Sequence, residues 1–350
     1  MKKVMFYIHS LNKGGAERVL LAVADYLSTI YDIVIVTDTV DELEYALPAG
    51  VRRVNLDDTG VSTIQRLKLL RTVSKKEQPD KMVGFMISSA IRLIVANIFC
   101  QVKLAAAIRS NPYDEFSSFL KRRLLNFLFL KCETVICQTT YQKDFFDKQV
   151  RKKCSIIPNP VFGTFCIESY HGIRDKKIVT AGRLFDYKNH KLLIEAFSMI
   201  QNEFPDYQLF IYGEGPYREA TQEYIHALGL EKKVFLPGDT DDVAGAIEKA
   251  ALFILPSDTE GMPNALMEAM ALGLPVIATD CPCGGPRSLI TQGKNGYLCE
   301  MGNAGQMAEF MENILRDEEL AENLSLEAAK IQNTHAINKI CSMWRAYIEQ

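Results

Sequence analysis

The chain has 350 residues, more than one ordinary domain, which favours two domains. Apolar residues make up 48% of it, enough for two hydrophobic cores. The sequence contains no run of about 18 apolar residues, the length that a membrane-spanning helix needs, so we expect no such helix. The net charge of −3 argues against a dedicated nucleic-acid-binding protein. The nine cysteines lack the spacings of a zinc site or a disulfide framework, so we expect free thiols in a reducing, cytoplasmic setting.

Short apolar strands alternate with helical segments through the first half of the chain. The first strand, Val4–Ile8, leads through Gly14 and Gly15 into a helix with apolar residues at helical spacing. This order predicts a parallel sheet with helices on both faces and ligands at the carboxyl ends of the strands. The glycine loop lacks the G-x-G-x-x-G dinucleotide pattern. Further strands are expected at Asp32–Thr37, Val51–Leu56, Lys81–Met86, Val102–Ile108 and Glu133–Gln138, and helices at 62–77 and 88–99.

Residues 114–131 predict one basic amphipathic helix. One interpretation places it in a bilayer surface, because large apolar side chains flanked by basic residues suit the lipid headgroup region. The other packs it on the sheet, with its basic residues merely solvated. The pattern alone leaves both open. The apolar stripe comprises Phe116, Phe119, Leu120, Leu124, Phe127 and Leu128, and the basic residues beside it are Lys121, Arg122 and Arg123.

Pro158 and Pro160 surround one residue at the midpoint and end regular structure, so we place the domain boundary there. The predicted domains are 1–160 and 161–334, and a last helix at about 335–350 is expected to pack back on the first. Both domains are expected to be Rossmann-like doubly wound α/β units that face a cleft. In the second domain we expect strands at 178–181, 207–212, 234–236, 252–255 and 275–278, and helices at 186–200, 243–250, 264–272, 304–316 and 318–331.

The stretch Ser257–Pro275 contains two carboxylates around a tight turn. Glu260 lies in the turn, and Glu268 lies in the apolar helix that follows, where an unpartnered carboxylate is costly. Helix side chains lean toward the N-terminus, so Glu268 points back to the turn. Exposed N–H groups and the helix dipole make that turn suitable for phosphate. A nucleotide sugar fits this pattern; a turn with one solvated and one capping acid is the alternative.

Several motifs occur in one order along the chain: GGAERV, IPNP, GRL followed by KN, YGEGP, and EGMPNALMEAMALGLPVIATD. With these motifs the chain resembles the family 4 glycosyltransferases over essentially its whole length. The resemblance implies the two-domain GT-B fold, an acceptor-side first domain, a donor-binding second domain, and retention of anomeric configuration without a metal or other cofactor. CPCGGPRSLI resembles members that build capsular, exopolysaccharide or lipopolysaccharide repeat units. That implies a UDP-hexose or UDP-N-acetylhexosamine donor and a lipid-linked or oligosaccharide acceptor at the inner membrane face, reached through helix 114–131.

The resemblance also assigns roles in the donor half. Glu268 matches the residue that holds the ribose, and a carboxylate can accept from both hydroxyls of a cis-diol. Glu260 matches the residue that meets the transferred sugar. Arg183 and Lys188 match the basic pair on the diphosphate, where cations stabilise the departing charge. The turn facing the sugar and diphosphate is Gly261, Met262, Pro263 and Asn264, with the N–H groups of Met262, Asn264 and Ala265 as candidate donors.

Other matched positions carry looser roles. Glu214 lies in a loop that approaches the base or ribose in such proteins, although a solvated loop acid is the alternative. Gly14 and Gly15 would let their loop come close to the donor phosphates or the acceptor. Gly284, Gly285 and Arg287 would lie near the donor cleft, although Arg287 also fits a surface position.

The chain departs from the family in the first domain. Many relatives have a histidine near the reacting carbon, whereas the region after the fifth strand here offers Arg109 and Asn111. We expect Arg109 to join Glu260, Arg183 and Lys188 at the reaction centre. His9 is the only histidine in the first 160 residues, and we interpret it as a polar residue of the loop after the first strand.

Two other functions remain open. A UDP-sugar 2-epimerase has the same fold. A non-catalytic partner of another transferase is also possible, although the complete set of Arg183, Lys188, Glu260 and Glu268 argues against it.

Overall fold

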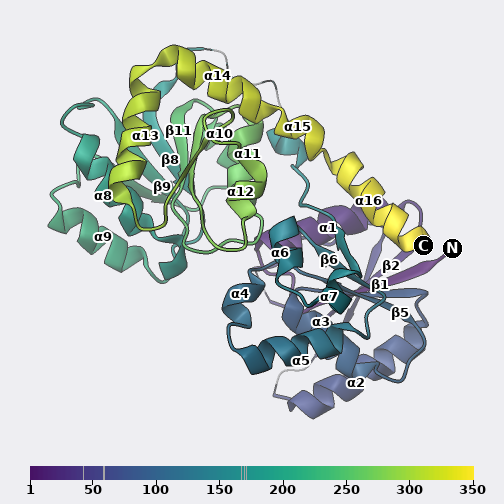
Figure 1. Cartoon of the computed structure of the whole chain (residues 1–350). Coiled ribbons are helices and arrows are strands. Elements are labelled where there is room, and N and C mark those ends of the chain that lie inside the picture. Colours follow the sequence, from purple (N-terminus) through teal and green to yellow (C-terminus); the bar gives the residue numbers. More distant parts are fainter. Residues whose placement is uncertain (42, 58–59, 167, 169, 171) are drawn as a thin grey trace. The chain divides into compact units, whose positions relative to one another are not determined.

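The computed structural model describes residues 1–41, 43–57, 60–166, 168, 170 and 172–350 (Figure 1). The chain forms two compact units. Unit 1 comprises Met1–Pro160 and Ile337–Gln350, and unit 2 comprises Val161–Ala336. Each unit is built on one parallel sheet with helices on its faces, which confirms the predicted class of two Rossmann-like α/β domains.

Seven parallel strands form the sheet of unit 1, in the order β3-β2-β1-β4-β5-β6-β7. The central strands are nearly continuous runs of buried apolar residues, as expected where helices cover both faces. Their bounds are β1 Lys3–Ile8, β2 Asp32–Thr37, β3 Val51–Asn55, β4 Lys81–Phe85, β5 Lys103–Ala107, β6 Thr134–Cys137 and β7 Cys154–Ile156.

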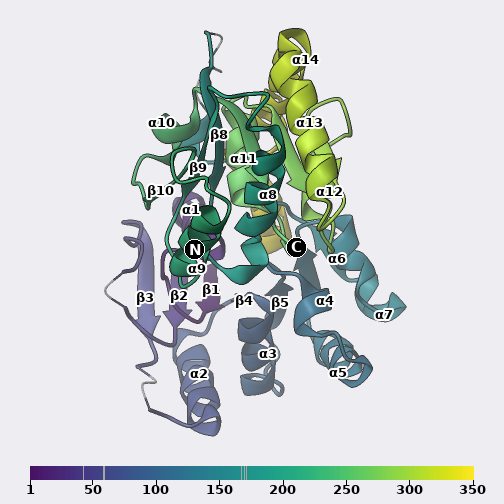
Figure 2. The same cartoon turned by 90° about the vertical axis from the view of Figure 1, so that its left-hand side faces the viewer.

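Helices α2, α3 and α5 lie side by side on one face of this sheet (Figures 1 and 2), and α1 and α16 pack on the other. The helices of unit 1 are α1 Gly15–Ser28, α2 Thr63–Glu77, α3 Ile87–Ala96, α4 Pro112–Glu115, α5 Phe119–Phe129, α6 Thr140–Asp144, α7 Lys148–Arg151 and α16 Ile337–Glu349.

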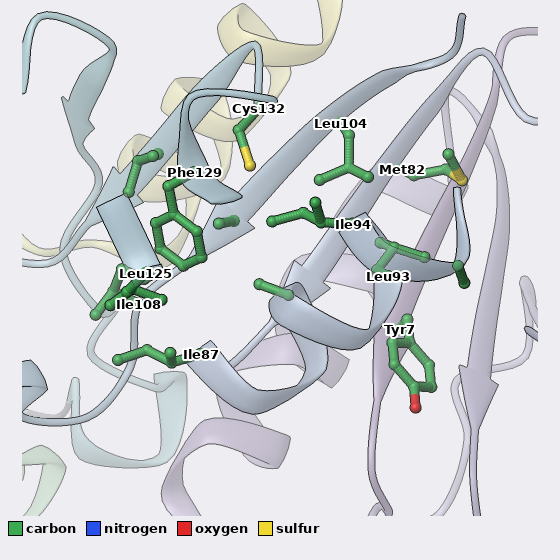
Figure 3. Packing of buried hydrophobic residues seen from close by; sticks show 14 of the residues in the cluster. Tyr7, Met82, Ile87, Leu93, Ile94, Leu104, Ile108, Leu125, Phe129 and Cys132 are labelled. Atoms are coloured by element: carbon green, nitrogen blue, oxygen red, sulfur yellow. The ribbon is translucent and has the colours of Figure 1, made fainter. Parts of the chain in front are cut away.

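One hydrophobic core lies between the sheet and helices α2, α3 and α5. It contains alternate residues of the strands and the buried residues of these helices. Figure 3 shows Ile87 and Ile94 of α3 gathered with Leu104 of β5 and with Leu125 and Phe129 of α5. All five side chains are buried. Because strand side chains alternate between faces, one strand serves both cores.

The opposite core is organised around Trp344 of α16, which is fully buried. Its ring lies edge-on to Phe6 at 6.1 Å and stacks on Phe85 at 6.1 Å between ring centres. Lys81 Nζ donates to the carbonyl of Tyr347 at 2.8 Å and so ties the end of the helix to β4. The last helix of the chain is therefore an integral part of unit 1.

The predicted single helix over 114–131 is wrong. The structure has α4, a break at Ser117 and Ser118, and then α5. Ser118 is the N-cap of α5, and its hydroxyl accepts from the N–H of Lys121 at 3.3 Å. This local cap starts a new helix although the apolar spacing continues through it. Among the helices in the described part of the chain, none is long and apolar enough to cross a membrane.

Six parallel strands form the sheet of unit 2, in the order β10-β9-β8-β11-β12-β13. Helices α8 and α13 pack together over one core, and α10, α11 and α12 contribute to the other (Figure 1). The strands are β8 Asp175–Ala181, β9 Gln208–Tyr212, β10 Val234–Gly238, β11 Ala250–Leu255, β12 Val276–Thr279 and β13 Tyr297–Cys299. The helices are η1 Gly163–Phe165, η2 Asp186–Lys188, α8 His190–Ile200, α9 Arg218–Ala227, α10 Val243–Ile247, α11 Asn264–Ala271, α12 Gly285–Leu289, α13 Ala304–Arg316, α14 Glu318–Ala329 and α15 Ile331–Thr334.

We expect Trp344→Ala to destabilise unit 1 by ~3–5 kcal/mol, the usual cost of removing a buried tryptophan side chain. Hydrogen exchange of the β1 and β4 amides measures it. Met343→Ala on the same helix is the control, because that side chain is 37% exposed and its loss should cost under ~1 kcal/mol. Equal exchange rates in the two variants would contradict this account of the core.

Candidate functional site

The sheet of unit 2 has a topological switch point between β8 and β11. From β8 the chain proceeds through β9 to β10 in one direction, whereas from β11 it proceeds through β12 to β13 in the other. Ligands of α/β proteins bind outside the carboxyl ends of strands at such a point. The loops that follow β8 and β11 carry Arg183, Lys188 and Glu260, so these predicted residues reach the same edge of the sheet.

Lys188 and Glu260 meet directly. Lys188 Nζ donates to Glu260 Oε1 at 2.6 Å, and the two side chains are only 19% and 11% exposed. Two further hydrogen bonds join the same loops: Asp258 N donates to the carbonyl of Tyr187 at 2.8 Å, and Asn189 Nδ2 donates to Asp258 Oδ1 at 2.8 Å. The ion pair is therefore held by a braced pair of loops. The bracing residues Tyr187, Asn189 and Asp258 were missed by sequence reasoning.

The start of α8 shapes the surroundings of Lys188. Asn189 adopts the left-handed conformation with φ of 46°, and its side-chain oxygen accepts from Leu192 N at 3.3 Å as the helix cap. His190 follows. Burial, with a smaller contribution from the charge of Lys188, lowers the pKa of His190 to about 4. Its imidazole is therefore neutral at pH 7 and adds no charge beside the lysine.

Arg183 lies in the loop after β8 with its side chain exposed. Its guanidinium lies 4.9 Å from the centre of the Phe185 ring, and one of its nitrogens donates to the Tyr187 hydroxyl at 3.4 Å. The aromatic neighbours steady the cation at the carboxyl end of β8. Arg183 and Lys188 together give this loop two positive charges.

The turn that follows β11 leads into α11. Pro263 is the N-cap residue and has no side-chain hydrogen-bonding group, and the first turn after it is uncharged. Such a helix start favours an anion, because the dipole leaves positive charge there. Glu268 lies one turn further along, 5% exposed. The structure thus places Gly261 to Ala265 and Glu268 on one continuous turn and helix beside Glu260.

The start of α12, which follows β12, packs against this turn. A Cβ built on Gly285 would lie 2.1 Å from the carbonyl oxygen of Gly261, so only glycine fits without displacing the turn. Thr279 Oγ1 donates to the carbonyl of Ser257. Burial, and then the nearby charge of Glu260, raises the pKa of the Cys281 thiol above its usual range. Arg287 pairs with Asp280 at the surface.

Glu214 reaches the neighbourhood of the β8 loop. A Cβ on Gly213, whose φ is +129°, would lie 2.1 Å from the carbonyl oxygen of Gly182, so the two loops touch through their backbones. The carboxylate of Glu214 forms an ion pair with the Arg218 guanidinium at 2.6 Å. The sequence analysis did not predict this partner. Arg218 also donates to the carbonyl of Leu236 at 2.8 Å. A donor role for Glu214 stays a prediction.

The predicted residues of unit 1 belong to separate surroundings. Gly14 is the N-cap of α1 in extended conformation, and Gly15 is the first residue of that helix. Asn111 caps α4 by accepting from Tyr113 N at 3.1 Å. The local geometry of Gly14, Gly15 and Asn111 does not indicate which part of a substrate they contact, and their roles stay predictions.

Arg109 lies in the interior of unit 1, only 8% exposed. Its guanidinium lies 4.9 Å from the Phe85 ring centre and 5.2 Å from that of Trp344. It donates to the carbonyl of Ile157 and to Asn159 Oδ1, each at 3.2 Å, and so fastens the IPNP motif. Burial lowers its pKa to about 9. These contacts give Arg109 a structural role, and its catalytic role stays a prediction.

We expect Gly285→Ala to lower the free energy of unfolding of unit 2 by ~1–3 kcal/mol, because the new methyl group meets the carbonyl of Gly261. Urea unfolding followed by hydrogen exchange of the β11 and β12 amides measures it. Gly163→Ala is the matched control, since a Cβ there meets nothing within 4 Å. If both variants unfold alike, the proposed close packing of the turn is wrong.

Comparison with known proteins agrees with this geometry. Residues 170–331 match the family described as glycosyl transferases group 1. A Haemophilus influenzae protein named uncharacterized glycosyltransferase is 26% identical, with 99% of this chain and 100% of the relative covered. The Campylobacter jejuni protein N-acetylgalactosamine-N,N'-diacetylbacillosaminyl-diphospho-undecaprenol 4-alpha-N-acetylgalactosaminyltransferase is 26% identical, with 91% and 92% covered.

Solved structures show the same fold. The crystal structure of Anabaena Alr3699/HepE in complex with UDP matches with a TM-score of 0.83 at 18% identity, covering 100% of both chains. Sucrose-phosphate synthase from Thermosynechococcus elongatus matches with a TM-score of 0.87 at 15% identity, covering 100% of this chain and 99% of the other. These likenesses confirm the GT-B fold. The match of residues 170–331 to the glycosyl transferases group 1 family and the glycosyltransferase names of relatives along nearly the whole chain identify the chain as a glycosyltransferase.

Proposed function

We propose that the protein is a retaining glycosyltransferase of family 4 that moves a hexose or N-acetylhexosamine from a UDP-sugar to a lipid-diphosphate-linked glycan. The observation that carries the proposal is the Lys188–Glu260 pair at the switch point of unit 2, beside the start of α11. A cation, a carboxylate and a helix N-terminus suit the diphosphate and the sugar of one donor.

We propose one orientation of the donor in this site. The diphosphate would lie at the start of α11 against Arg183 and Lys188, the ribose hydroxyls at Glu268, and the transferred sugar at Glu260. Lys188 is already held at 2.6 Å from Glu260, so the cation and the carboxylate are positioned before the donor arrives. Two cations beside the phosphates suit a reaction without a metal.

In the proposed reaction the bond from the sugar C1 to the diphosphate oxygen breaks, and UDP leaves with the electron pair. The acceptor hydroxyl attacks C1 from the face that the diphosphate leaves, and its proton passes to the leaving phosphate oxygen. Arg183 and Lys188 stabilise the charge that builds on the diphosphate. The configuration at C1 is retained.

The names of similar proteins support the choice of substrates. Anabaena Alr3699/HepE is described in complexes with UDP and with UDP-glucose, and a Staphylococcus aureus TarM variant in a complex with UDP. The C. jejuni relative acts on a diphospho-undecaprenol glycan by its name. A UDP-sugar donor and a lipid-linked acceptor of a surface polysaccharide are therefore the substrates that we propose.

Helix α5 supports an acceptor at a membrane surface. Leu125, Asn126 and Phe129 are buried against unit 1, so the helix is anchored by one side only. Its other side carries four apolar residues that are 60–78% exposed, beside the exposed Lys121 and Arg123. An exposed apolar face with basic neighbours suits an anionic lipid surface. We propose peripheral binding at the cytoplasmic face of the cell membrane. The four residues are Phe119, Leu120, Leu124 and Phe127.

A donor screen tests the proposed reaction. UDP release is measured from UDP-glucose, UDP-galactose and their N-acetylated forms, without acceptor and with undecaprenyl-diphosphate-linked N-acetylgalactosamine. We expect slow hydrolysis of one donor and faster release with an acceptor glycan. Conversion of UDP-N-acetylglucosamine to its manno epimer without acceptor would instead identify an epimerase.

We expect Glu268→Ala to weaken UDP binding by ~1.5–3 kcal/mol, the scale of hydrogen bonds to a charged group. Calorimetric titration with UDP measures the affinity, and circular dichroism checks the fold. Glu309→Ala, an exposed acid on α13, is the control and should bind UDP as the parent does. Unchanged affinity in a folded Glu268→Ala variant would remove the ribose role.

We expect the triple change Lys121→Glu, Leu124→Ser and Phe127→Ser to abolish flotation with vesicles containing phosphatidylglycerol. Charge reversal and loss of two large apolar groups remove both attractions to the surface.

The matched control makes the same kinds of change on α2: Ile64→Ser, Lys68→Glu and Leu69→Ser, all at exposed positions. This control should float with the vesicles as the parent does. A parent protein that does not float, or equal loss in both triple variants, would contradict membrane binding through α5.

A further inference from the structure

Four side chains form a connected polar cluster at the carboxyl ends of β1 and β2 in unit 1. Its centre is the carboxylate of Asp38, which is fully buried. Tyr7 Oη donates to Asp38 Oδ1 at 2.6 Å, His9 Nδ1 lies 2.7 Å from Asp38 Oδ2, and Arg92 forms an ion pair with the same oxygen. A buried carboxylate persists only with such partners.

The partners of Asp38 decide which nitrogen of His9 carries a proton. A carboxylate can only accept, so Nδ1 must donate to it. In the neutral imidazole the second nitrogen, Nε2, then has a free lone pair and acts as an acceptor. The Asp38 side chain is 0% exposed whereas the His9 side chain is 54% exposed. The imidazole therefore reaches from the buried carboxylate toward solvent and presents an acceptor there.

Tyr7 and Arg92 stabilise the charge of the carboxylate. Arg92 also donates to the Tyr7 hydroxyl at 3.3 Å, so the three groups form a closed set. Burial, and then the hydrogen bond to Asp38, raises the pKa of Tyr7 above its usual range, so the phenol stays protonated. The charges of Asp38 and Arg92 balance. In the Nδ1–H tautomer the exposed Nε2 thus offers an acceptor, which suits a hydroxyl donor better than the oxygens of a phosphate, which themselves accept.

Backbone contacts hold His9 in place. Its carbonyl accepts from Asp38 N at 2.9 Å and from Thr39 N at 3.3 Å, which joins the ends of β1 and β2. Further along the same loop, Leu11 N donates to Glu44 Oε1 at 3.1 Å, and Glu44 pairs with Arg53. A fixed imidazole of this kind binds a ligand without a large ordering cost.

The cluster lies at the switch point of its own sheet. From β1 the chain proceeds to β2 and β3 in one direction, and from β4 it proceeds to β5, β6 and β7 in the other. His9 is the residue directly after β1, and Asp38 is the residue directly after β2. The carboxyl end of the sheet at this point is where an α/β unit binds its ligand.

We propose that His9 binds a hydroxyl group of the glycan acceptor through Nε2, with Asp38 fixing the tautomer and Tyr7 and Arg92 holding Asp38. His9 is then a substrate-binding residue, and the other three are positioning residues. The inference rests on the proposed glycosyl transfer and adds to it a site for the acceptor.

The first test reads the tautomer. Protein labelled with ¹⁵N in histidine is measured by NMR at pH 8.5, and His9→Gln assigns the His9 signals. We expect the Nδ1–H tautomer in the parent. Asp38→Asn should reverse it, because the amide donates to Nδ1 and moves the proton to Nε2. An Nε2–H tautomer, or an even mixture, in the parent would overturn the proposal.

The second test separates acceptor binding from donor chemistry. With the donor that the UDP-release screen selects and undecaprenyl-diphosphate-linked N-acetylgalactosamine as acceptor, His9→Ala should raise the acceptor KM by about tenfold, the loss of one hydrogen bond. Hydrolysis of the donor without acceptor should stay within about twofold of the parent. His9→Gln should recover part of the loss, because its amide oxygen can accept in place of Nε2.

The control is His226→Gln on α9, which removes another histidine–carboxylate pair, 2.5 Å from Glu231 and exposed. It should leave both rates unchanged. An active His9→Ala variant with an unchanged acceptor KM, or one whose hydrolysis falls in parallel with transfer, overturns the role of His9. A parent protein that releases no UDP from any donor contradicts the proposed function instead. The His9 variants keep Tyr7, Asp38 and Arg92, so the kinetics do not depend on the folding of Asp38→Asn.

Discussion

The ion pair of Lys188 with Glu260 is the interaction on which the proposed donor site depends. It joins the loops that follow the neighbouring strands β8 and β11, and it lies mostly out of water, where attraction between opposite charges is strong. Removing both charges from water costs free energy, so the pair requires a fixed geometry. The hydrogen bond from Asn189 to Asp258 helps to hold the two loops in that geometry. The sheet determines only where the two loops begin. We propose that the pair determines what the site between them binds.

The two units use one architecture for different chemistry. Each has a parallel sheet with a switch point, and each gathers polar side chains at the carboxyl ends of strands near that point. In unit 2 the exposed Arg183 adds a positive charge beside the Lys188–Glu260 pair and the start of α11, which suits a diphosphate. In unit 1 the charges of Asp38 and Arg92 balance, and Nε2 of the proposed Nδ1–H tautomer of His9 is an acceptor, which suits a hydroxyl. Donor and acceptor chemistry can thus be distinguished by local charge.

Much of the fold could be predicted because buried parallel strands are continuous apolar runs; Asp32–Thr37 was placed to the residue. The single helix over 114–131 was wrong because the cap at Ser118 is a local hydrogen bond that apolar spacing does not reveal. His9 and Asp38 are 29 residues apart and meet only through the pairing of β1 with β2. The predicted roles of Lys188 and Glu260 came from family resemblance. Their direct contact, between residues 72 apart in sequence, required the fold.

A crystal structure with UDP bound tests the donor site most directly. We predict the diphosphate at the start of α11, in contact with Arg183 and Lys188, and the ribose hydroxyls on Glu268. A nucleotide bound at the Asp38 cluster of unit 1, or one in unit 2 with its diphosphate away from Lys188, would contradict the proposed donor site.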